Sequence, residues 1–333
     1  MKLTQTLSPL LSITIPTLNR SEYLCKALRS IFAAEWDRSK VEICISNNAS
    51  DEDYSAVESL VKTAPHGLVI RYVVQPSRLP IDEHMMAVKN LAMSPYIYFL
   101  GDDDFFLDNQ LPLLLELIER EAPDLAIFNG MIVDAQDRVM GSHFSLAAQR
   151  YTDIGAAFHD LRDKGMFGAV LVKAEHLDNR DFKCLFGTAH GYGCYWFSLL
   201  KRDALSQGLT ILVPAFPLVA LRMAAKSYSL PEVYYRDIPY EIAVYQRFLP
   251  PGRAQDLNHQ FKLRYLRKIS SVKFITYILS QGTEKSKLRK IDPGFYRQYR
   301  LSIFISQILA NTGAYEFLKS LYRSICKWKQ HLK

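Results

Sequence analysis

The N-terminal half of the chain repeats one pattern, in which a short apolar run is followed by a polar turn and then by apolar residues at helical spacing. The first two apolar runs occupy residues 11–15 and 41–45. Two more runs, at 68–74 and 96–100, flank a segment with helical periodicity at 81–91. Strands that alternate with helices of this length are joined by right-handed crossovers. The pattern therefore predicts a Rossmann-like α/β fold with a mainly parallel sheet and flanking helices.

Three of these predicted strands end in polar clusters. Residues 16–20 follow the first strand, residues 46–53 follow the second, and residues 101–104 (Gly-Asp-Asp-Asp) follow the last. Ligands of open α/β sheets bind beyond the carboxyl ends of the strands, so we expect the clusters to form one site. Adjacent carboxylates repel one another unless a cation lies between them, and Mg²⁺ and Mn²⁺ prefer carboxylate oxygen. The sequence predicts a divalent-cation site, with a plain acidic turn as the alternative.

The segments SITIPTLNR (12–20), ISNNASD (45–51) and YIYFLGDDD (96–104), in this order and spacing, resemble the nucleotide-sugar half of family 2 glycosyltransferases. Members of that family have the GT-A fold. The resemblance is good between residues 10 and 130 and extends loosely to about residue 225. It implies a GT-A glycosyltransferase domain at residues 1–225, and we expect residues 226–333 to form a basic, mostly α-helical C-terminal region.

The resemblance implies roles for individual residues. Asp102 would contact the ribose, while Asp103 and Asp104 would bind the Mg²⁺ or Mn²⁺ that bridges the sugar diphosphate. Gly101 replaces the first aspartate of the commoner D-x-D motif, which shifts the cation ligands by one residue toward the C-terminus. The nucleotide-sugar-binding residues that the resemblance implies are Pro16, Thr17, Asn19, Arg20, Asn48, Arg78 and Asp102.

Some positions depart from the family pattern. Asn47 stands where many members have Asp, and an amide can either accept from uracil N3–H or donate to cytosine N3. The donor is therefore expected to be a UDP-, dTDP-, CDP- or GDP-linked sugar, without a choice among them. Pro80 and His84 depart from the Asn-x-Gly…Asn pattern that relatives show near Arg78, which leaves the contacts to the donor sugar open.

An acceptor hydroxyl needs a general base within hydrogen-bond reach. The family places this base about ninety residues after the acidic motif, but residues 181–197 of this chain lack the family's Glu-Asp pair. His190 is the best-placed ionisable group there, since an ordinary histidine pKa of about 6.5 suits a base at neutral pH. Asp181 is the alternative base, and helix capping or phosphate binding is the alternative role for His190.

The composition of the chain indicates where in the cell the protein is expected. No stretch of eighteen or more residues runs without charge or proline, so we predict no transmembrane helix. The N-terminus lacks the pattern of a secretory signal. The five cysteines are scattered and have no C-x-x-C spacing, which is typical of reduced thiols in a cytosol. These features favour a cytoplasmic protein.

The positive charge of the chain lies in its C-terminal region. Residues 262–333 hold sixteen Lys and Arg against three acids, and the whole chain has a formal net charge of +7, so the first 261 residues are acidic. Apolar residues at helical intervals in this region predict basic amphipathic helices, which bind anionic membrane surfaces. Packing on the catalytic domain or in a homodimer is the alternative. No nucleic-acid-binding module accompanies the charge, so nucleic acid is not an expected partner.

Together these features predict a metal-dependent, inverting glycosyltransferase that moves a sugar from a nucleotide-sugar donor to a hydroxyl of a glycan acceptor. The resemblance points to a lipid-linked oligosaccharide acceptor and to bacterial surface-polysaccharide assembly, such as that of O-antigen or capsule, on the inner face of the plasma membrane. A nucleotidyltransferase is the enzymatic alternative, but residues 16–20 lack the glycine-rich phosphate loop of such enzymes. A catalytically degenerate family member that serves as an assembly partner is the non-enzymatic alternative.

Overall fold

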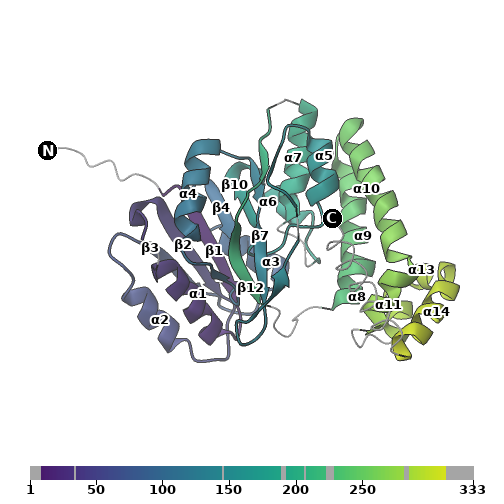
Figure 1. The fold of residues 1–333 in the computed structure, drawn as a ribbon, viewed down its shortest axis with the longest axis horizontal. Helices are drawn as coiled ribbons and strands as arrows, with labels where there is room; N and C mark the ends of the chain where they lie inside the picture. Colours follow the sequence, from purple (N-terminus) through teal and green to yellow (C-terminus); the bar gives the residue numbers. More distant parts are fainter. Residues whose placement is uncertain are drawn as a thin grey trace, which may run out of the picture. The chain divides into compact units, whose positions relative to one another are not determined.

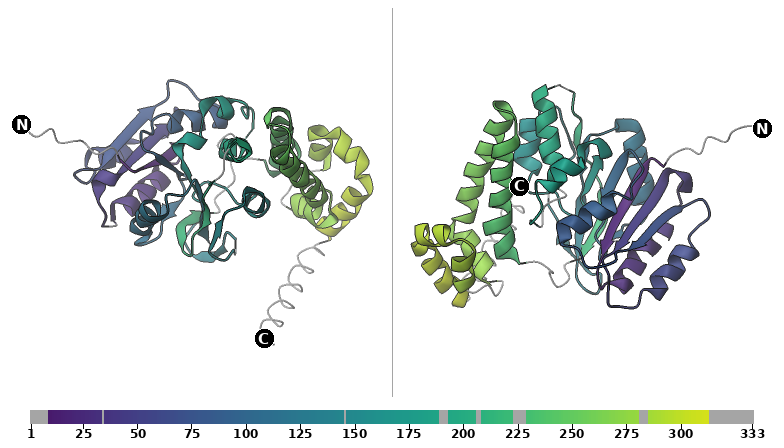
Figure 2. Two further views of the ribbon diagram at one scale, coloured as in Figure 1. Left: turned by 90° about the horizontal axis from the view of Figure 1, so that it is seen from above. Right: turned by 180° about the vertical axis from the view of Figure 1, so that it is seen from behind.

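The structure is a computed structural model, and its chain divides into two compact units (Figures 1 and 2). The first unit comprises Met1–Lys226 and Phe248–Leu257, and the second comprises Ser227–Arg247 and Asn258–Lys333. The residues that the structure describes are 9–33, 35–144, 146–188, 193–205, 208–222, 229–280 and 285–312.

An eight-stranded sheet lies at the centre of the first unit, in the part of the chain that the structure describes, with the order β3-β2-β1-β4-β10-β6-β11-β9. The first four strands in this order are parallel to one another: β3 (Val69–Val74), β2 (Val41–Asn47), β1 (Leu11–Thr17) and β4 (Tyr96–Phe99). Beyond β4 the sheet is mixed, because β10 is antiparallel to both β4 and β6. The remaining strands are β10 (Val170–Lys173), β6 (Leu125–Ile127), β11 (Ile211–Val213) and β9 (Gln149–Tyr151).

Helices cover both faces of the parallel strands, which is why β1 and β2 are buried along almost their whole length. One face is apolar, with Ile13, Ile15 and Ile43 among its residues, and it packs in one core with helices α1, α2 and α4 (Figure 1). Helix α3 contacts β1 and β2. The helices of the first unit are α1 (Ser21–Ala33), η1 (Arg38–Lys40), α2 (Ser55–Lys62), α3 (Ile81–Lys89), α4 (Gln110–Glu121), α5 (Ile154–Leu161), η2 (Ala174–His176), α6 (Asn179–Lys183) and α7 (Cys194–Leu205).

The other face of β1 and β2 carries a buried carboxylate, Glu42. Its oxygens accept hydrogen bonds from Ser12 Oγ at 2.6 Å, Met93 N at 2.6 Å and Ser94 N at 3.1 Å. Arg71 Nε on β3 donates to Glu42 at 2.9 Å. Burial alone would raise the pKa of Glu42, but these hydrogen bonds hold the pKa below its usual value. An ionised Glu42 therefore ties β1, β2 and β3 to the segment that leads into β4.

A second sheet of four strands, in the order β5-β12-β7-β8 among the described residues, was not predicted from the sequence. Its strand β5 (Phe105–Phe106) follows the acidic motif at once and pairs antiparallel with β12 (Pro217–Arg222). Strands β7 (Asn129–Val133) and β8 (Val139–Ser142) complete the sheet. This pairing brings the end of β12 beside residues 102–104, from a position more than a hundred residues further along the chain.

The described part of the second unit is helical, which agrees with the predicted C-terminal helical region. No helix among the described residues combines the length and the apolarity that crossing a membrane requires. Residues 313–333, the end of the region for which amphipathic helices are predicted, lie outside the described residues. The C-terminal helices, of which α9 and α10 extend into the first unit, are α8 (Leu230–Glu232), η4 (Val233–Asp237), α9 (Ile238–Phe248), α10 (Arg253–Ile269), α11 (Val272–Ser280), α12 (Lys285–Ile291), α13 (Pro293–Gln298) and α14 (Arg300–Asn311).

Gly168 lies between β4 of the first sheet and β12 of the second, and a substitution there tests how closely the two sheets pack. It has a φ of +73°, its N–H donates to Phe99 O at 2.7 Å, and an added Cβ would lie 2.6 Å from Leu221 Cδ2. We expect Gly168→Ala to lower the free energy of unfolding by about 3 kcal/mol, because backbone strain and overpacking add. Gly67→Ala is the matched control, since Gly67 also has a positive φ but its Cβ would meet only ordinary contacts. Denaturant unfolding should show a loss of about 1 kcal/mol for the control, and equal losses would refute the packing argument.

Candidate functional site

The acidic residues after β4 lie against the turn after β1. Arg20 Nη1 donates to Asp102 Oδ1 at 3.2 Å and to Asp103 Oδ2 at 2.8 Å. The backbone N–H of Leu18 also points to Asp102 Oδ2, at 3.4 Å. Residues 16–20 and 101–104 thus meet at the carboxyl edge of the sheet, where β1 and β4 are parallel neighbours. One guanidinium is shared by two carboxylates at this point.

Burial sets the electrostatics of this cluster. Burial raises the pKa of Asp102 to about 6, against the opposing effect of the Arg20 charge. Burial and the neighbouring charge of Asp103 raise the pKa of Asp104 well above its usual value, although Arg222 N donates to Asp104 Oδ1 at 2.9 Å. Added positive charge would favour the ionised form of the carboxylates in this cluster. Its hard oxygen donors therefore fit a divalent cation, which would supply that charge.

Two residues that the sequence reasoning did not single out, Gly168 and Arg222, lie next to Asp104. Gly168 leaves room for it, since a Cβ there would lie 3.2 Å from Asp104 Oδ2. The guanidinium of Arg222 donates from Nε to Asp103 O at 3.1 Å and from Nη1 to Asp134 O at 3.2 Å. Both contacts come from segments distant in sequence, so no local signal could have identified them.

The structure also explains the departure at Gly101. A Cβ on Gly101 would lie 2.6 Å from Asp104 Oδ2 and 3.2 Å from Asp103 Oδ1. An aspartate at this position would collide with the buried Asp104 carboxylate. The shift of the acidic motif by one residue and the burial of Asp104 are therefore one structural feature.

The turn after β1 contacts a tyrosine that the sequence reasoning also missed. Tyr54 is buried, and its hydroxyl lies 2.8 Å from Thr17 Oγ1 and accepts from Arg20 N at 3.2 Å. Pro16 is half-buried on β1, opposite Ser46 on β2. Tyr54 thus fixes the backbone of the turn that carries Arg20.

Asn19 connects the turn after β1 to the turn after β2, and Arg78, in the loop after β3, contacts the turn after β2. Asn19 has a left-handed backbone with φ of 54°, and its Oδ1 accepts from Asp51 N at 2.8 Å. Ser50 Oγ accepts from Asn19 N at 2.9 Å. Arg78, which is more than half exposed, forms an ion pair with Asp51. These contacts make one rim from two of the predicted polar clusters.

The two asparagines after β2 hold the backbone of neighbouring loops. Asn48 pairs in both directions with Leu79, because its Nδ2 donates to Leu79 O at 3.0 Å and its Oδ1 accepts from Leu79 N at 2.8 Å. Asn47 Oδ1 accepts from Ser50 N at 3.0 Å, and Asn47 Nδ2 donates to Tyr72 OH at 3.2 Å. The amide of Asn48 therefore shapes the loop that carries Arg78.

Of the two candidate bases, His190 and Asp181, only Asp181 is among the described residues. His190 lies outside the described residues. Asp181 is buried on α6, and Lys201 Nζ on α7 donates to both of its oxygens, at 2.6 and 2.7 Å. A second buried carboxylate, Asp82 on the first turn of α3, accepts from the backbone N–H of Gly187, just before the segment that contains His190. Sequence reasoning missed Asp82.

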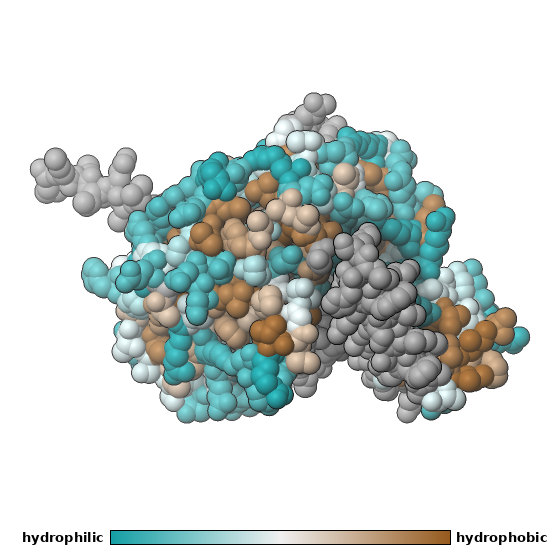
Figure 3. All heavy atoms as spheres, viewed as in Figure 1, coloured by the Kyte–Doolittle hydropathy of each residue, from teal (hydrophilic) through white to brown (hydrophobic). Residues whose placement is uncertain are grey.

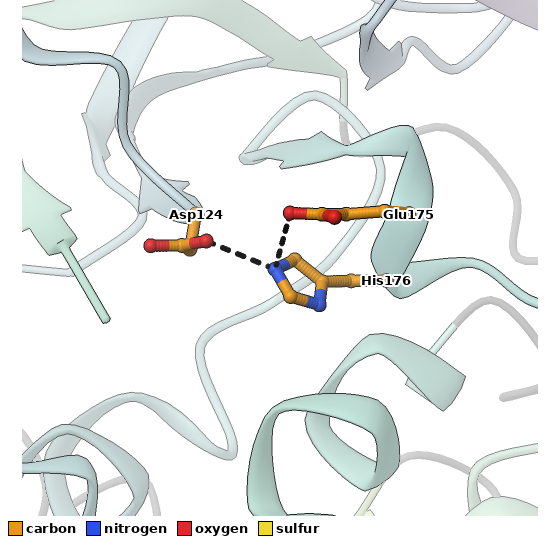
Figure 4. Close-up of side chains that lie close together, drawn as sticks. All are labelled: Asp124, Glu175 and His176. Atoms are coloured by element: carbon orange, nitrogen blue, oxygen red, sulfur yellow. Dashed lines mark hydrogen bonds and ion pairs between the residues drawn. The ribbon is translucent and has the colours of Figure 1, made fainter. Parts of the chain in front are cut away.

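A separate cluster of potential metal ligands consists of Asp124, Glu175 and His176 (Figure 4). His176 Nε2 is 3.1 Å from Asp124 Oδ1 and 3.9 Å from Glu175 Oε1. Glu175 and His176 follow β10, which runs antiparallel to β4, so they lie at the end of the sheet away from the acidic motif. Lys173 Nζ lies 3.2 Å from Asp124, and Arg202 Nη1 lies 2.6 Å from Glu175. These carboxylates already face cationic side chains, so we interpret the cluster as a structural ion network.

Most of the first unit matches the model of one protein family. The model of glycosyl transferase family 2 matches residues 12–206, which is more than half of the chain. The chain belongs to this family.

Individual relatives are similar over a shorter span. Over 113 residues the chain is 32% identical to abequosyltransferase RfbV of Salmonella typhimurium, a match that covers 34% of each protein. Over 124 residues it is 26% identical to a processive diacylglycerol beta-glycosyltransferase of Mycoplasma genitalium, which covers 37% of this chain and 36% of that protein. The matches span about a third of the length of these curated relatives.

Solved structures resemble the chain over most of its length. The complex of S. aureus TarS 1–349 with UDP-GlcNAc aligns with a TM-score of 0.59 and 13% identity, over 92% of both chains. The complex of the same protein with UDP aligns with a TM-score of 0.57 and 11% identity, over 92% of this chain and 91% of that one. At such identity the likeness shows the fold, and the predicted GT-A fold is confirmed.

The ion network at Asp124 leads to a prediction about stability. Burial would raise the pKa of Asp124, but hydrogen bonds with His176 and Thr210 N and the charge of Lys173 lower it to about 2 from an ordinary 3.8. Because the pKa is lowered on folding, the stabilisation is complete above about pH 4 and is lost as the pH falls toward 2. We expect Asp124→Asn to lower the free energy of unfolding by about 2 kcal/mol at pH 7, with a smaller difference in acid.

Denaturant unfolding of both proteins between pH 7 and pH 3 provides the measurement. Binding of Mn²⁺, followed by calorimetry with and without nucleoside diphosphate, should be the same in Asp124→Asn and in the wild type. Loss of metal binding in Asp124→Asn would show instead that this cluster is a metal site.

Proposed function

We propose that this enzyme transfers a sugar from a nucleotide-sugar donor, bound at the carboxyl ends of β1, β2 and β4, to a hydroxyl of a glycan acceptor. The observation that carries the proposal is the convergence of Arg20, Asp102 and Asp103 on one point of this edge. The complex of TarS with UDP-GlcNAc and the name of the abequosyltransferase relative support a nucleotide-sugar donor and a role in surface-polysaccharide assembly.

The acidic cluster would hold the metal and the ribose. Asp103 and Asp104 are proposed to bind Mg²⁺ or Mn²⁺, and Asp102 to accept from the ribose hydroxyls. A cation bound there supplies Lewis-acid stabilisation of the departing diphosphate. Arg20, which contacts Asp102 and Asp103, would lie beside the diphosphate, and a guanidinium is well suited to a diphosphate because it donates in a planar fork.

The nucleoside side would be formed by the rim between the first two turns, which includes Pro16, Thr17, Asn19, Asn48 and Arg78. Asn48 already pairs with the Leu79 backbone, so its effect on the base would pass through the shape of that loop. The proposal leaves UDP-, dTDP-, CDP- and GDP-linked sugars as candidate donors.

The acceptor side requires a base, and we assign this role to His190. The structure supports this choice over Asp181, because Lys201 contacts both oxygens of the Asp181 carboxylate. In the proposed step the acceptor oxygen attacks the anomeric carbon as the bond from that carbon to the diphosphate breaks. His190 takes the hydroxyl proton, the nucleoside diphosphate leaves with the bonding electrons, and the configuration at the anomeric carbon is inverted.

The proposed acceptor is a lipid-linked glycan at the inner face of the plasma membrane. The name of the diacylglycerol glycosyltransferase relative supports a lipid-borne acceptor. In this proposal residues 1–225 form the catalytic domain, and the basic residues 226–333 hold the cytoplasmic enzyme on an anionic membrane surface. Buried Tyr265, Ile269 and Ile275 would then serve the packing of this region, and its charges would serve the membrane contact.

Asp103→Asn tests the metal site. We expect it to abolish transfer and Mn²⁺-dependent binding of nucleoside diphosphate, with unchanged folding, because a half-buried turn carboxylate contributes little to packing. Asp108→Asn, an exposed acid in the same segment, should retain both activities. Calorimetry and turnover in excess EDTA are the measurements. Full activity of Asp103→Asn, or turnover that EDTA does not change, contradicts the mechanism.

His190→Ala tests the base. The variant should lower kcat by about 10² to 10⁴, with little change in donor affinity, because the interaction is made only in the transition state. The wild-type rate should fall as the pH drops through the histidine pKa, since a protonated imidazole cannot accept the proton. Asp181→Asn is the comparison. A larger loss of kcat in Asp181→Asn than in His190→Ala would transfer the assignment to Asp181.

A further inference from the structure

Helix α14 (Arg300–Asn311) has one apolar face that is open to solvent among the described residues. The exposed fractions are 72% for Leu301, 53% for Phe304, 40% for Ile305 and 47% for Ile308. Residues three and four positions apart lie on the same side of a helix, so these four side chains form one stripe. Figure 3 shows apolar residues gathered at the lower right, where Figure 1 labels α14.

The opposite face of α14 is firmly packed. Ile303 and Ser306 are completely buried, and Ser306 Oγ donates to Val272 O of α11 at 3.1 Å. Helices α11 and α14 are in close contact along their length. The exposed stripe is therefore presented by a helix whose orientation is fixed, and ordinary helices of this kind carry polar residues on their outer face.

The segment that contains the stripe, residues 285–312, carries mostly positive charges. Exposed cations on α12, α13 and the start of α14 are Arg289, Lys290, Arg297 and Arg300. Asp292 is the one acid among described residues 285–312, and its carboxylate accepts from Phe295 N at 2.9 Å as the cap of α13. An apolar stripe in a cationic segment of the chain matches the interface of an anionic bilayer, which offers both an acyl boundary and negative phosphates.

We propose that α14 lies flat on an anionic membrane, with Leu301, Phe304, Ile305 and Ile308 inserted at the acyl boundary and the neighbouring cations at the lipid phosphates. The inference rests on the proposed use of a lipid-linked acceptor, and it adds which helix binds the membrane and which of its faces is inserted. A second copy of the chain would bring the same cations against this face. The chain's own residues 313–333 carry five Lys and Arg and one acid, so they also have the wrong charge.

Vesicle binding by the full chain tests the proposal. The triple variant Leu301→Gln, Phe304→Gln, Ile308→Gln should bind vesicles of phosphatidylglycerol and phosphatidylcholine at least tenfold more weakly than the wild type. The matched control, Val139→Gln with Met140→Gln, removes two apolar side chains that are 61% and 68% exposed on β8 and should bind normally. Pure phosphatidylcholine vesicles should bind the wild type poorly. Sedimentation measures the binding of the three proteins to both kinds of vesicle, once thermal unfolding has shown that the variants are as stable as the wild type.

Insertion has a second readout that does not depend on the triple variant. Phe304→Trp should shift its fluorescence to the blue on anionic vesicles and should be quenched by lipids brominated on the acyl chain. Unchanged fluorescence, or vesicle binding equal in the triple variant and the wild type, overturns the proposal. A wild-type dimer that the triple variant converts to a monomer also overturns it and assigns the stripe to a second copy. Loss of donor hydrolysis in Asp103→Asn with normal vesicle binding would separate the membrane contact from the catalytic site.

Discussion

The burial of acidic side chains at the carboxyl edge of the parallel strands is the constraint on which the site depends. Asp102 and Asp104 are buried, and Arg20 is divided between Asp102 and Asp103. Burial raises the pKa of both Asp102 and Asp104, and the charge of Arg20 only partly offsets this effect at Asp102. A cluster of this kind is stabilised by a cation, which links the fold to the proposed chemistry.

The surroundings of the site follow from that burial. Gly101 and Gly168 have no Cβ where one would press on Asp104, and β12 supplies the backbone N–H of Arg222 to its carboxylate. The second sheet thus completes the environment of a motif that the first sheet begins. Tyr54 and Asn48 act in the same way on the proposed nucleotide side, since each fixes the backbone of a loop.

The parallel half of the fold could be predicted because its signals are local. The apolar run at 41–45, for instance, continues in the structure as β2 to Asn47, and the polar turns then follow from the strand ends. The second sheet could not be predicted, because β12 pairs with β5 and β7 from far along the chain. The same limit applies to Asp181, whose partner Lys201 is a tertiary contact, and to Asp124, whose ion network joins separate segments.

The central claim is that a nucleotide sugar binds at the ends of β1, β2 and β4 through a divalent cation. The most direct measurement is the thermal stability of the full chain against a panel of UDP-, dTDP-, CDP- and GDP-sugars, with Mn²⁺ and with EDTA. We expect sugars linked to one of these nucleotides to stabilise the protein only with Mn²⁺, by about 2.7 kcal/mol at a hundred times the Kd of the sugar nucleotide. Stabilisation of equal size in EDTA, or none by any member of the panel, would contradict it.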